Sequence, residues 1–325
     1  MVSYSRYVSL LIILIMSVGC EPENQDDDTI ITTTPMNLGD INSVYDDYNS
    51  AAPYPSHRTE VFFSSNRNSA GKEFDFVSGK IDFLVKDDML KFHIPNDVAP
   101  RITETIYPLI NTAENEYGPY VCLMEQTLFF LYSTSPEGNS DVSFVELTRW
   151  NYDSSSQTLS SVLSITGTNS VENDAYPFID TLNQSIYFCS NREAGRYDIF
   201  SVPYDGVLSK DALIGTNPTR VEKQTRFSST SDDKCPYIQD NVMVFASNRP
   251  GGFGGYDIWY SKFEEDQWGP PLNCGVSINT EFDEFRPIIF EVLFYDVMIF
   301  SSDRPGGKGG FDLYISEQNF GDYYG

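Results

Sequence analysis

Short runs of Val, Ile, Phe and Tyr recur along the whole chain, and turns rich in Gly, Pro, Asn and Asp separate them. Nowhere does a segment of 12 or more residues show the apolar spacing of an amphipathic helix. Turn-bounded runs of this kind are typical of β-strands joined by hairpins. The pattern therefore predicts an all-β protein.

The runs belong to a repeated unit. A Phe-x-Ser-Asn-Arg core, with Asp for Asn in the last copy, occurs four times, and an aromatic residue followed by Asp comes after each. The repeated charged residues are Arg67 and Asp75, Arg192 and Asp198, Arg249 and Asp257, and Arg304 and Asp312. The last three arginines lie 57 and 55 residues apart, but 125 residues separate the first from the second. We expect a degenerate copy in that gap, at residues 128–133, with Thr134 in the arginine position.

A second block precedes every core and contains an Asn or Ser, two acidic or amide residues and a Pro. Five units result, and four short strands in each suit the blades of a β-propeller. Residues 34–39 resemble residues 270–275 of the fourth unit, a segment that the fifth unit lacks. We therefore expect a single five-bladed β-propeller over residues 30–318, in which the N-terminal strand completes the last blade and closes the ring.

The N-terminus predicts export. Residues 1–19 have a weakly basic start, an apolar run too short to span a membrane, and small residues before Cys20. They predict a lipoprotein signal peptide with lipidation at Cys20, and an ordinary secretory signal is the alternative. Residues 20–29 are expected to form an acidic tether, and residues 319–325 a short C-terminal tail. The predicted location is the outer membrane, through the lipid anchor, with the cell surface favoured over the periplasmic face.

Charge limits the partners. The chain has 47 Asp and Glu against 21 Lys and Arg, a net charge of −26. Such a surface repels nucleic acids and anionic head groups. It is compatible with a basic protein, a peptide or a neutral glycan.

Four cysteines remain besides Cys20, and in an exported protein they allow three disulfide pairings, among which the sequence does not choose. They are Cys122, Cys189, Cys235 and Cys274. Cys189 lies in a predicted buried strand, where a free thiol is equally compatible. The two histidines are scattered and no Cys-x-x-Cys spacing exists, so no metal or cofactor site is expected.

Residues that recur in nearly every unit serve what every blade needs. We expect the repeated Arg and Asp to fix hairpins or to link blades through charge-assisted hydrogen bonds, and the acidic pairs to bond blade to blade or cap turns. Catalysis would need residues unique to one blade, and no catalytic residue is assigned. The candidates are His57, His93, Glu125, Trp150, Glu222 and Trp268.

The Asp-Glu-x-x-Pro block at residues 283–287, the cores at residues 245–252 and 300–307, and the segment 256–259 resemble the WD40-like repeat of TolB-type propellers in envelope lipoproteins of Bacteroidota. The resemblance implies a scaffold that binds protein partners and has no catalytic residues. The sequence prediction is therefore a non-enzymatic outer-membrane lipoprotein that binds an envelope protein, a peptide or a glycan. The alternative is a surface glycoside hydrolase or lyase, whose paired carboxylates would straddle the axis.

Overall fold

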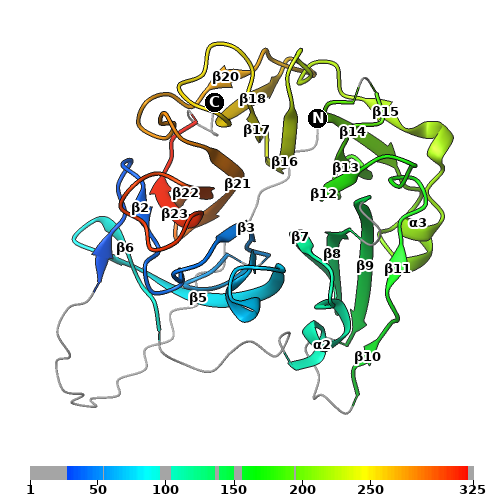
Figure 1. Ribbon diagram of the computed structural model, residues 1–325, viewed down its shortest axis with the longest axis horizontal. Helices are drawn as coiled ribbons and strands as arrows, with labels where there is room; N and C mark the ends of the chain where they lie inside the picture. Colours follow the sequence, from blue (N-terminus) through cyan, green and yellow to red (C-terminus); the bar gives the residue numbers. More distant parts are fainter. Residues whose placement is uncertain are drawn as a thin grey trace, which may run out of the picture.

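The computed structural model describes residues 28–53, 55–95, 104–135, 139–149, 156–193 and 195–320. Within them, five antiparallel sheets stand around a central axis, each with its first strand innermost (Figure 1). The prediction of an all-β, five-bladed propeller is confirmed. The predicted signal peptide, Cys20, Trp150 and residues 321–325 lie outside the described residues.

Blades one and two come from the N-terminal half of the chain and have five strands each. Blade one contains β3 (Asp47–Ala51), β4 (Arg58–Ser65), β5 (Asp75–Lys86), β6 (Met89–His93) and β1 (Thr29–Ile30). Blade two contains β7 (Glu116–Met124), β8 (Thr127–Thr134) and β9 (Asp141–Thr148), with β10 (Thr158–Leu159) and β11 (Leu163–Ser164) both paired to β9.

Blades three to five follow the same plan. Blade three contains β12 (Asp174–Asp180), β13 (Ser185–Ser190), β14 (Asp198–Pro203) and β15 (Glu222–Lys223). Blade four contains β16 (Asp233–Gln239), β17 (Val242–Ser247), β18 (Asp257–Glu264), β19 (Gln267–Trp268) and β20 (Leu272–Asn273). Blade five contains β21 (Glu284–Val292), β22 (Tyr295–Ser302), β23 (Asp312–Glu317) and β2 (Met36–Asn37).

The ring closes as the sequence predicts. Strand β2 pairs with β23, placing Met36 opposite Ile315, so an N-terminal segment completes the last blade. Strand β1 pairs with β6 and extends the outer edge of blade one. The sequence did not indicate this pairing. Each pairing covers the edge of a longer strand with a strand of two residues.

Helices are confined to connections. They are α2 (Tyr107–Ile110), α3 (Lys210–Ile214) and the 3₁₀ turns η1 (Arg67–Ser69) and η3 (Pro218–Arg220). No helix of the described residues is long and apolar enough to cross a bilayer.

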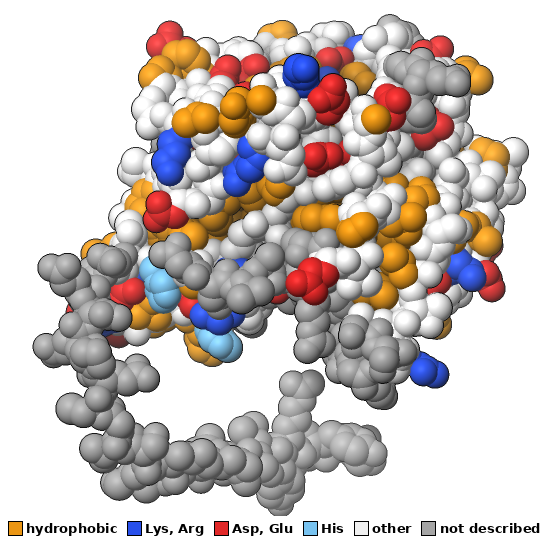
Figure 2. Space-filling model, turned by 60° about the horizontal axis from the view of Figure 1, so that its bottom comes forward, with side chains coloured by type: hydrophobic (Ala, Val, Ile, Leu, Met, Phe, Trp, Pro, Cys, Tyr) orange, Lys and Arg blue, Asp and Glu red, His pale blue; other side chains and the backbone are white. Residues whose placement is uncertain are grey.

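Neighbouring blades share apolar cores, which is why the ring is a single domain. Phe63 of blade one packs in one cluster with Ile299 and Leu313 of blade five, and Phe129 of blade two packs in another with Phe188 of blade three. Phe320, which the predicted boundary places in the tail, is also buried, with its ring 5.1 Å from that of Tyr260. On the face seen in Figure 2, the exposed hydrophobic side chains gather in bands between charged ones.

Candidate functional site

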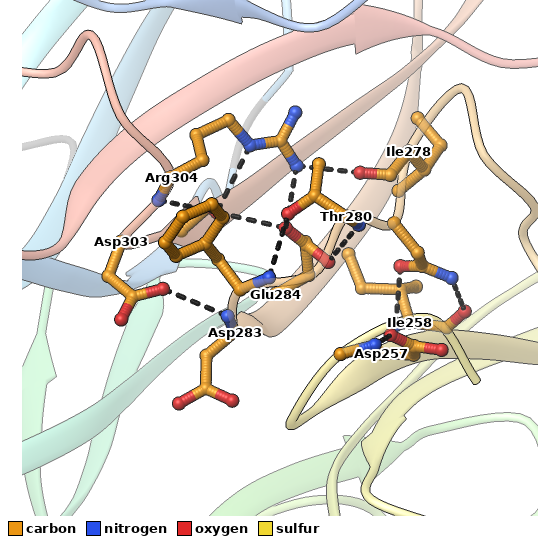
Figure 3. A network of polar contacts seen from close by, with 12 residues as sticks. Asp257, Ile258, Ile278, Thr280, Asp283, Glu284, Asp303 and Arg304 are labelled. Atoms are coloured by element: carbon orange, nitrogen blue, oxygen red, sulfur yellow. Dashed lines mark hydrogen bonds and ion pairs between the residues drawn. The ribbon is translucent and has the colours of Figure 1, made fainter.

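At one end of the ring, an arginine in four of the five blades binds an acid of its own blade. The acid is the first residue of the innermost strand and is fully buried. The shortest N–O distances are 2.5 Å for Arg67–Asp47, 2.6 Å for Arg192–Asp174, 2.5 Å for Arg249–Asp233 and 2.9 Å for Arg304–Glu284. Figure 3 shows the last pair, where Arg304 Nη2 also donates to the carbonyl of Ile278. The arginine thus ties the second strand of the blade to the entry of the first.

The residue before each buried acid links neighbouring blades. Asp283 of blade five accepts a hydrogen bond from the Tyr256 amide of blade four at 2.6 Å, and Asp46 of blade one accepts one from the Phe311 amide of blade five at 3.0 Å. In blade two, Asn115 makes the same contact with Phe74 of blade one.

The Asp of each aromatic-Asp pair has a different position from the buried acid. Asp257 accepts hydrogen bonds from the Phe253 amide and from Asn273 Nδ2, and Asp312 accepts them from the Lys308 amide and from Asn37 Nδ2. Asp198 pairs with Lys223 at 2.6 Å, and Asp75 accepts from Asn68 Nδ2 at 3.2 Å. These carboxylates hold the loop or the outer strand of their own blade.

Blade two departs from the others, and the register corrects one prediction. Thr134 pairs with Glu116 as Ser302 pairs with Glu284, so Thr134 occupies the serine position and not the arginine position. By count the arginine position falls at residue 136, a proline in the sequence and outside the described residues. Glu116 therefore has no arginine partner among the described residues, and its Oε2 has no hydrogen bond. Burial raises the pKa of Glu116 to about 7.

One residue from each blade lies at the axis of the ring, and these five residues form one layer across it. These positions lie at the bulges of the innermost strands and all have positive φ. They are Asn49, Gly118, Tyr176, Cys235 and Arg286. None of these five residues is a carboxylate.

Carboxylates and aromatic rings meet instead in a cleft of about 470 Å³ between blades three and four. The end of β12 contributes Asp180, and the turn after it contributes Asn183. The end of β16 contributes Gln239, and the turn after it contributes Asp240. Its aromatic lining comes from six strands of blades two, three and four and consists of Tyr120, Phe178, Tyr187, Tyr237, Phe263 and Trp268. Because the turns between first and second strands all lie at one end of a propeller, the cleft opens opposite the arginine end.

The two carboxylates of the cleft differ in burial and in the number of hydrogen bonds that they accept. Asp180 is buried and accepts three hydrogen bonds, from the amides of Leu182 and Asn183 and from Asn183 Nδ2. Asp240 is exposed and accepts one, from Gln239 Nε2 at 3.1 Å. Asp180 is thus held in one orientation, whereas Asp240 can follow a ligand.

The aromatic lining is ordered by its own contacts. The ring of Phe178 lies 5.1 Å from those of both Tyr120 and Tyr237, and Trp268 lies 5.3 Å from Phe263. Burial, together with the nearby charge of Asp180, raises the pKa of Tyr187 to about 12, so this hydroxyl stays protonated. No Lys, Arg or His is among the described residues that line the cleft. The site therefore suits an uncharged ligand with hydroxyl groups and apolar faces.

Of the five singled-out residues that the structure describes, only Trp268 is in this cleft. His57 and Glu125 are exposed in turns, His93 lies 3.4 Å from Asp28, and Glu222 is exposed in β15. Asp180 and Asp240 were missed. Their common signal, an acid where the first strand of a blade meets the turn to the second, becomes visible only once the strands are aligned.

The four described cysteines are free thiols, two of them buried. Cys235 donates its backbone amide to Cys189 Sγ at 3.0 Å. Within the part of the chain that the structure describes, no three of His, Cys, Asp and Glu lie close enough together to hold a metal ion.

Comparison with known proteins finds similar structures but no similar sequences. No protein-family model matches the chain, and no curated protein matches it significantly. Among solved structures, it is similar to the β-xylosidase RS223, with a TM-score of 0.55 at 11% identity over 88% of this chain and 95% of that one. It is also similar to an exo-1,5-α-L-arabinanase from a bovine ruminal metagenomic library (TM-score 0.52, 12% identity, 86% and 96% covered). A third is the exo-β-1,3-galactanase of Phanerochaete chrysosporium (TM-score 0.51, 12% identity, 88% and 65% covered).

These neighbours correct the functional prediction. The sequence resemblance pointed to a TolB-type, WD40-like scaffold that binds proteins and has no enzymatic activity, but the five-bladed rings that this fold matches are glycoside hydrolases. The motifs behind that resemblance are the arginine, acid and glycine positions that hold a blade together. The chain is shown to share its fold with five-bladed glycosidase propellers.

Proposed function

We propose that the protein is a glycoside hydrolase and that the cleft between blades three and four binds its glycan. One observation carries the proposal: the cleft combines an aromatic wall with carboxylates from two neighbouring blades, Asp180 and Asp240. The likeness of the fold to glycosidase propellers supports it.

Each part of the cleft has a role in binding a sugar. The C–H faces of a sugar ring are apolar and pack against aromatic rings such as Trp268 and Tyr237, while its hydroxyl groups donate hydrogen bonds to carboxylates and amide oxygens. Pockets with apolar walls and a few placed polar groups are the usual form of small-ligand sites. Because the lining is acidic and has no cation, the ligand is a neutral glycan.

Hydrolysis of a glycosidic bond needs two carboxyl groups. One protonates the leaving oxygen as the C–O bond breaks, and the other removes a proton from the attacking water or attacks the anomeric carbon itself. We assign to Asp180 the role of the base that activates the water or of the nucleophile that attacks the anomeric carbon, because three hydrogen-bond donors fix the orientation of its carboxylate. The exposed carboxyl of Asp240 delivers the proton.

The test is hydrolysis of nitrophenyl glycosides and neutral polysaccharides by the purified protein. The panel includes the arabinan, xyloside and galactan linkages that the names of the structural neighbours specify. We expect kcat to fall about 10²–10⁴-fold in Asp180→Asn and in Asp240→Asn. Trp268→Ala raises KM more than it lowers kcat, because it removes stacking and not chemistry.

The matched control is Asp205→Asn, because Asp205 is an exposed acid paired with Arg220 outside the cleft. Full activity is expected in this variant. Failure of the wild-type protein to hydrolyse any member of the panel would overturn the proposal, as would normal kcat in both cleft variants. Circular dichroism and the unfolding midpoint identify a variant that has lost its fold.

We propose in addition that the enzyme is anchored to the outer membrane by lipid on Cys20, facing the cell surface. The signal-like residues 1–19 and the acidic segment after Cys20 support this location. Cys20→Ser is expected to move the protein from the membrane fraction to the soluble fraction. Protease treatment of intact cells distinguishes the surface from the periplasmic face.

A further inference from the structure

Arg286 is a fully buried arginine at the axis of the ring. It stands at the bulge of β21, and its guanidinium reaches from blade five to blade two, where Nη2 donates to the Pro119 carbonyl at 3.0 Å. Its Cζ lies 5.8 Å from the ring centroid of Tyr176 in blade three. The side chain therefore spans the axis and contacts blades on its far side.

The charge of Arg286 has no counterpart in the part of the protein that the structure describes. Among the described residues, its Nε and Nη1 make no hydrogen bond and no carboxylate pairs with it. This separates Arg286 from the four repeated arginines, each of which binds a buried acid. A buried and uncompensated guanidinium is strongly unfavourable in a medium of low dielectric constant.

The titratable groups that face Arg286 are all neutral at physiological pH. They are the thiols of Cys189 and Cys235 and the hydroxyls of Tyr176 and Tyr237. Burial raises the pKa of Cys235 to about 12 even though Arg286 lowers it. Neither a thiolate nor a phenolate therefore supplies the missing negative charge.

A second buried polar group of the same layer is unpartnered. Asn49 holds the bulge position in blade one, which lies between blades five and two, and it is fully buried. Its Nδ2 and Oδ1 make no hydrogen bond, while its backbone amide donates to Ser301 Oγ of blade five at 3.1 Å. The axis thus holds N–H donors from two adjacent blades that the protein leaves unused.

We propose that the axis binds a small monovalent anion, such as chloride, through Arg286 and Asn49. A water molecule would satisfy some of these donors but would leave the guanidinium charge uncompensated. The layer is too tight for a large anion, because a Cβ added at Gly118 would lie 2.6 Å from the ring of Tyr176. The ion would lock the inner strands of the five blades together, away from the cleft.

The test compares unfolding of the whole protein in sodium chloride and in sodium gluconate at one ionic strength. An anion that binds only the folded state raises the unfolding midpoint with a saturable dependence on its concentration. We expect chloride to raise the midpoint by about 3–6 °C at saturation. Arg286→Met abolishes the dependence, Asn49→Ala weakens it, and Arg220→Met at an exposed ion pair keeps it.

A bromide-soaked crystal of the wild-type protein gives an independent measurement if Arg286→Met does not fold. The expected result is an anomalous peak within hydrogen-bonding distance of Arg286 Nε or Nη1. Equal midpoints in chloride and gluconate, or a crystal without that peak, would overturn the proposal. Neither result bears on glycan hydrolysis, since the cleft lies between blades three and four.

Discussion

Blades five and two both bury a glutamate at the start of the innermost strand, but among the described residues only blade five supplies all of its hydrogen-bond and charge partners. In both, a buried glutamate accepts hydrogen bonds from the backbone amide and the hydroxyl of a threonine four residues earlier, Thr280 for Glu284 and Thr112 for Glu116. In blade five, Ser302 and Arg304 complete the site. In blade two, no described residue does, and Glu116 Oε2 has no partner.

The difference shows how a blade can lack the arginine of the repeat and still fold. Burial raises the pKa of both glutamates, but Arg304 opposes this effect at Glu284. At Glu116 nothing of that kind acts, and its pKa rises to about 7. A protonated carboxyl group can be buried without a cation, so blade two remains folded while it becomes sensitive to pH.

Breaking the ion pair of blade five is expected to have the largest effect. Arg304→Met leaves Glu284 as a buried carboxylate without its cation, and such losses destabilise by about 3–5 kcal/mol. Chemical denaturation at pH 8 measures the change. As a matched control, Arg220→Met removes the exposed pair with Asp205 and should change stability by less than ~0.5 kcal/mol. A loss below ~1 kcal/mol in Arg304→Met would remove the basis of the comparison.

A smaller loss of stability, equal in the two blades, is expected from substituting an asparagine that makes the same contacts in both. Asn279, at the entry of blade five, bridges the backbone amide and carbonyl of Ile258, and Asn111 does the same with Phe76 at the entry of blade two. Each substitution to Ala should cost about 2 kcal/mol because two backbone groups lose a partner. Asn68→Ala, at an exposed side chain, is the control. Values for the two blades that differ by more than ~1 kcal/mol would mean that blade two departs in more than its acid site.

The smallest effect concerns pH. The pKa of Glu116 in the folded state lies above that of an ordinary glutamate, so its stabilising contribution is complete below about pH 4.5 and is lost as the pH rises through about 7. Glu116→Gln removes this loss and should be more stable than the wild type at pH 8 by ~1–2 kcal/mol, with little difference at pH 5.

Glu284→Gln gives the opposite sign and sharpens the comparison. It removes the charge that Arg304 needs, so we expect lower stability at both pH values. Unfolding curves of the three proteins at pH 5 and pH 8 distinguish these outcomes. Equal behaviour of the two variants would show that the arginine does not set the difference between the blades.

Much of the fold could be predicted because its determinants are local and repeated. The Asn before a first strand, the acid at its start and, in four blades, the Arg after the second strand make contacts within one blade or with a neighbouring one. The ring closure followed from the same logic, since residues 34–39 supply what the fifth unit lacks. The assignment of Thr134 failed because blade two carries no arginine that would set the alignment.

The functional prediction failed for a related reason. The motifs that resemble TolB-type repeats lie at the arginine end of the ring, whereas Asp180, Asp240 and Trp268 meet at the other end. No repeated motif marks these three residues.

The amino-acid sequence by itself determined the number of blades and the segment that closes the ring, because these depend on periodic patterns and on hydrogen bonds between near neighbours. Only the tertiary structure decided what occupies the axis and the cleft. Arg286 and the Pro119 carbonyl lie 167 residues apart along the chain, and Asp180 and Asp240 come from different blades. Such neighbours arise only when the curvature of all five sheets has closed the ring.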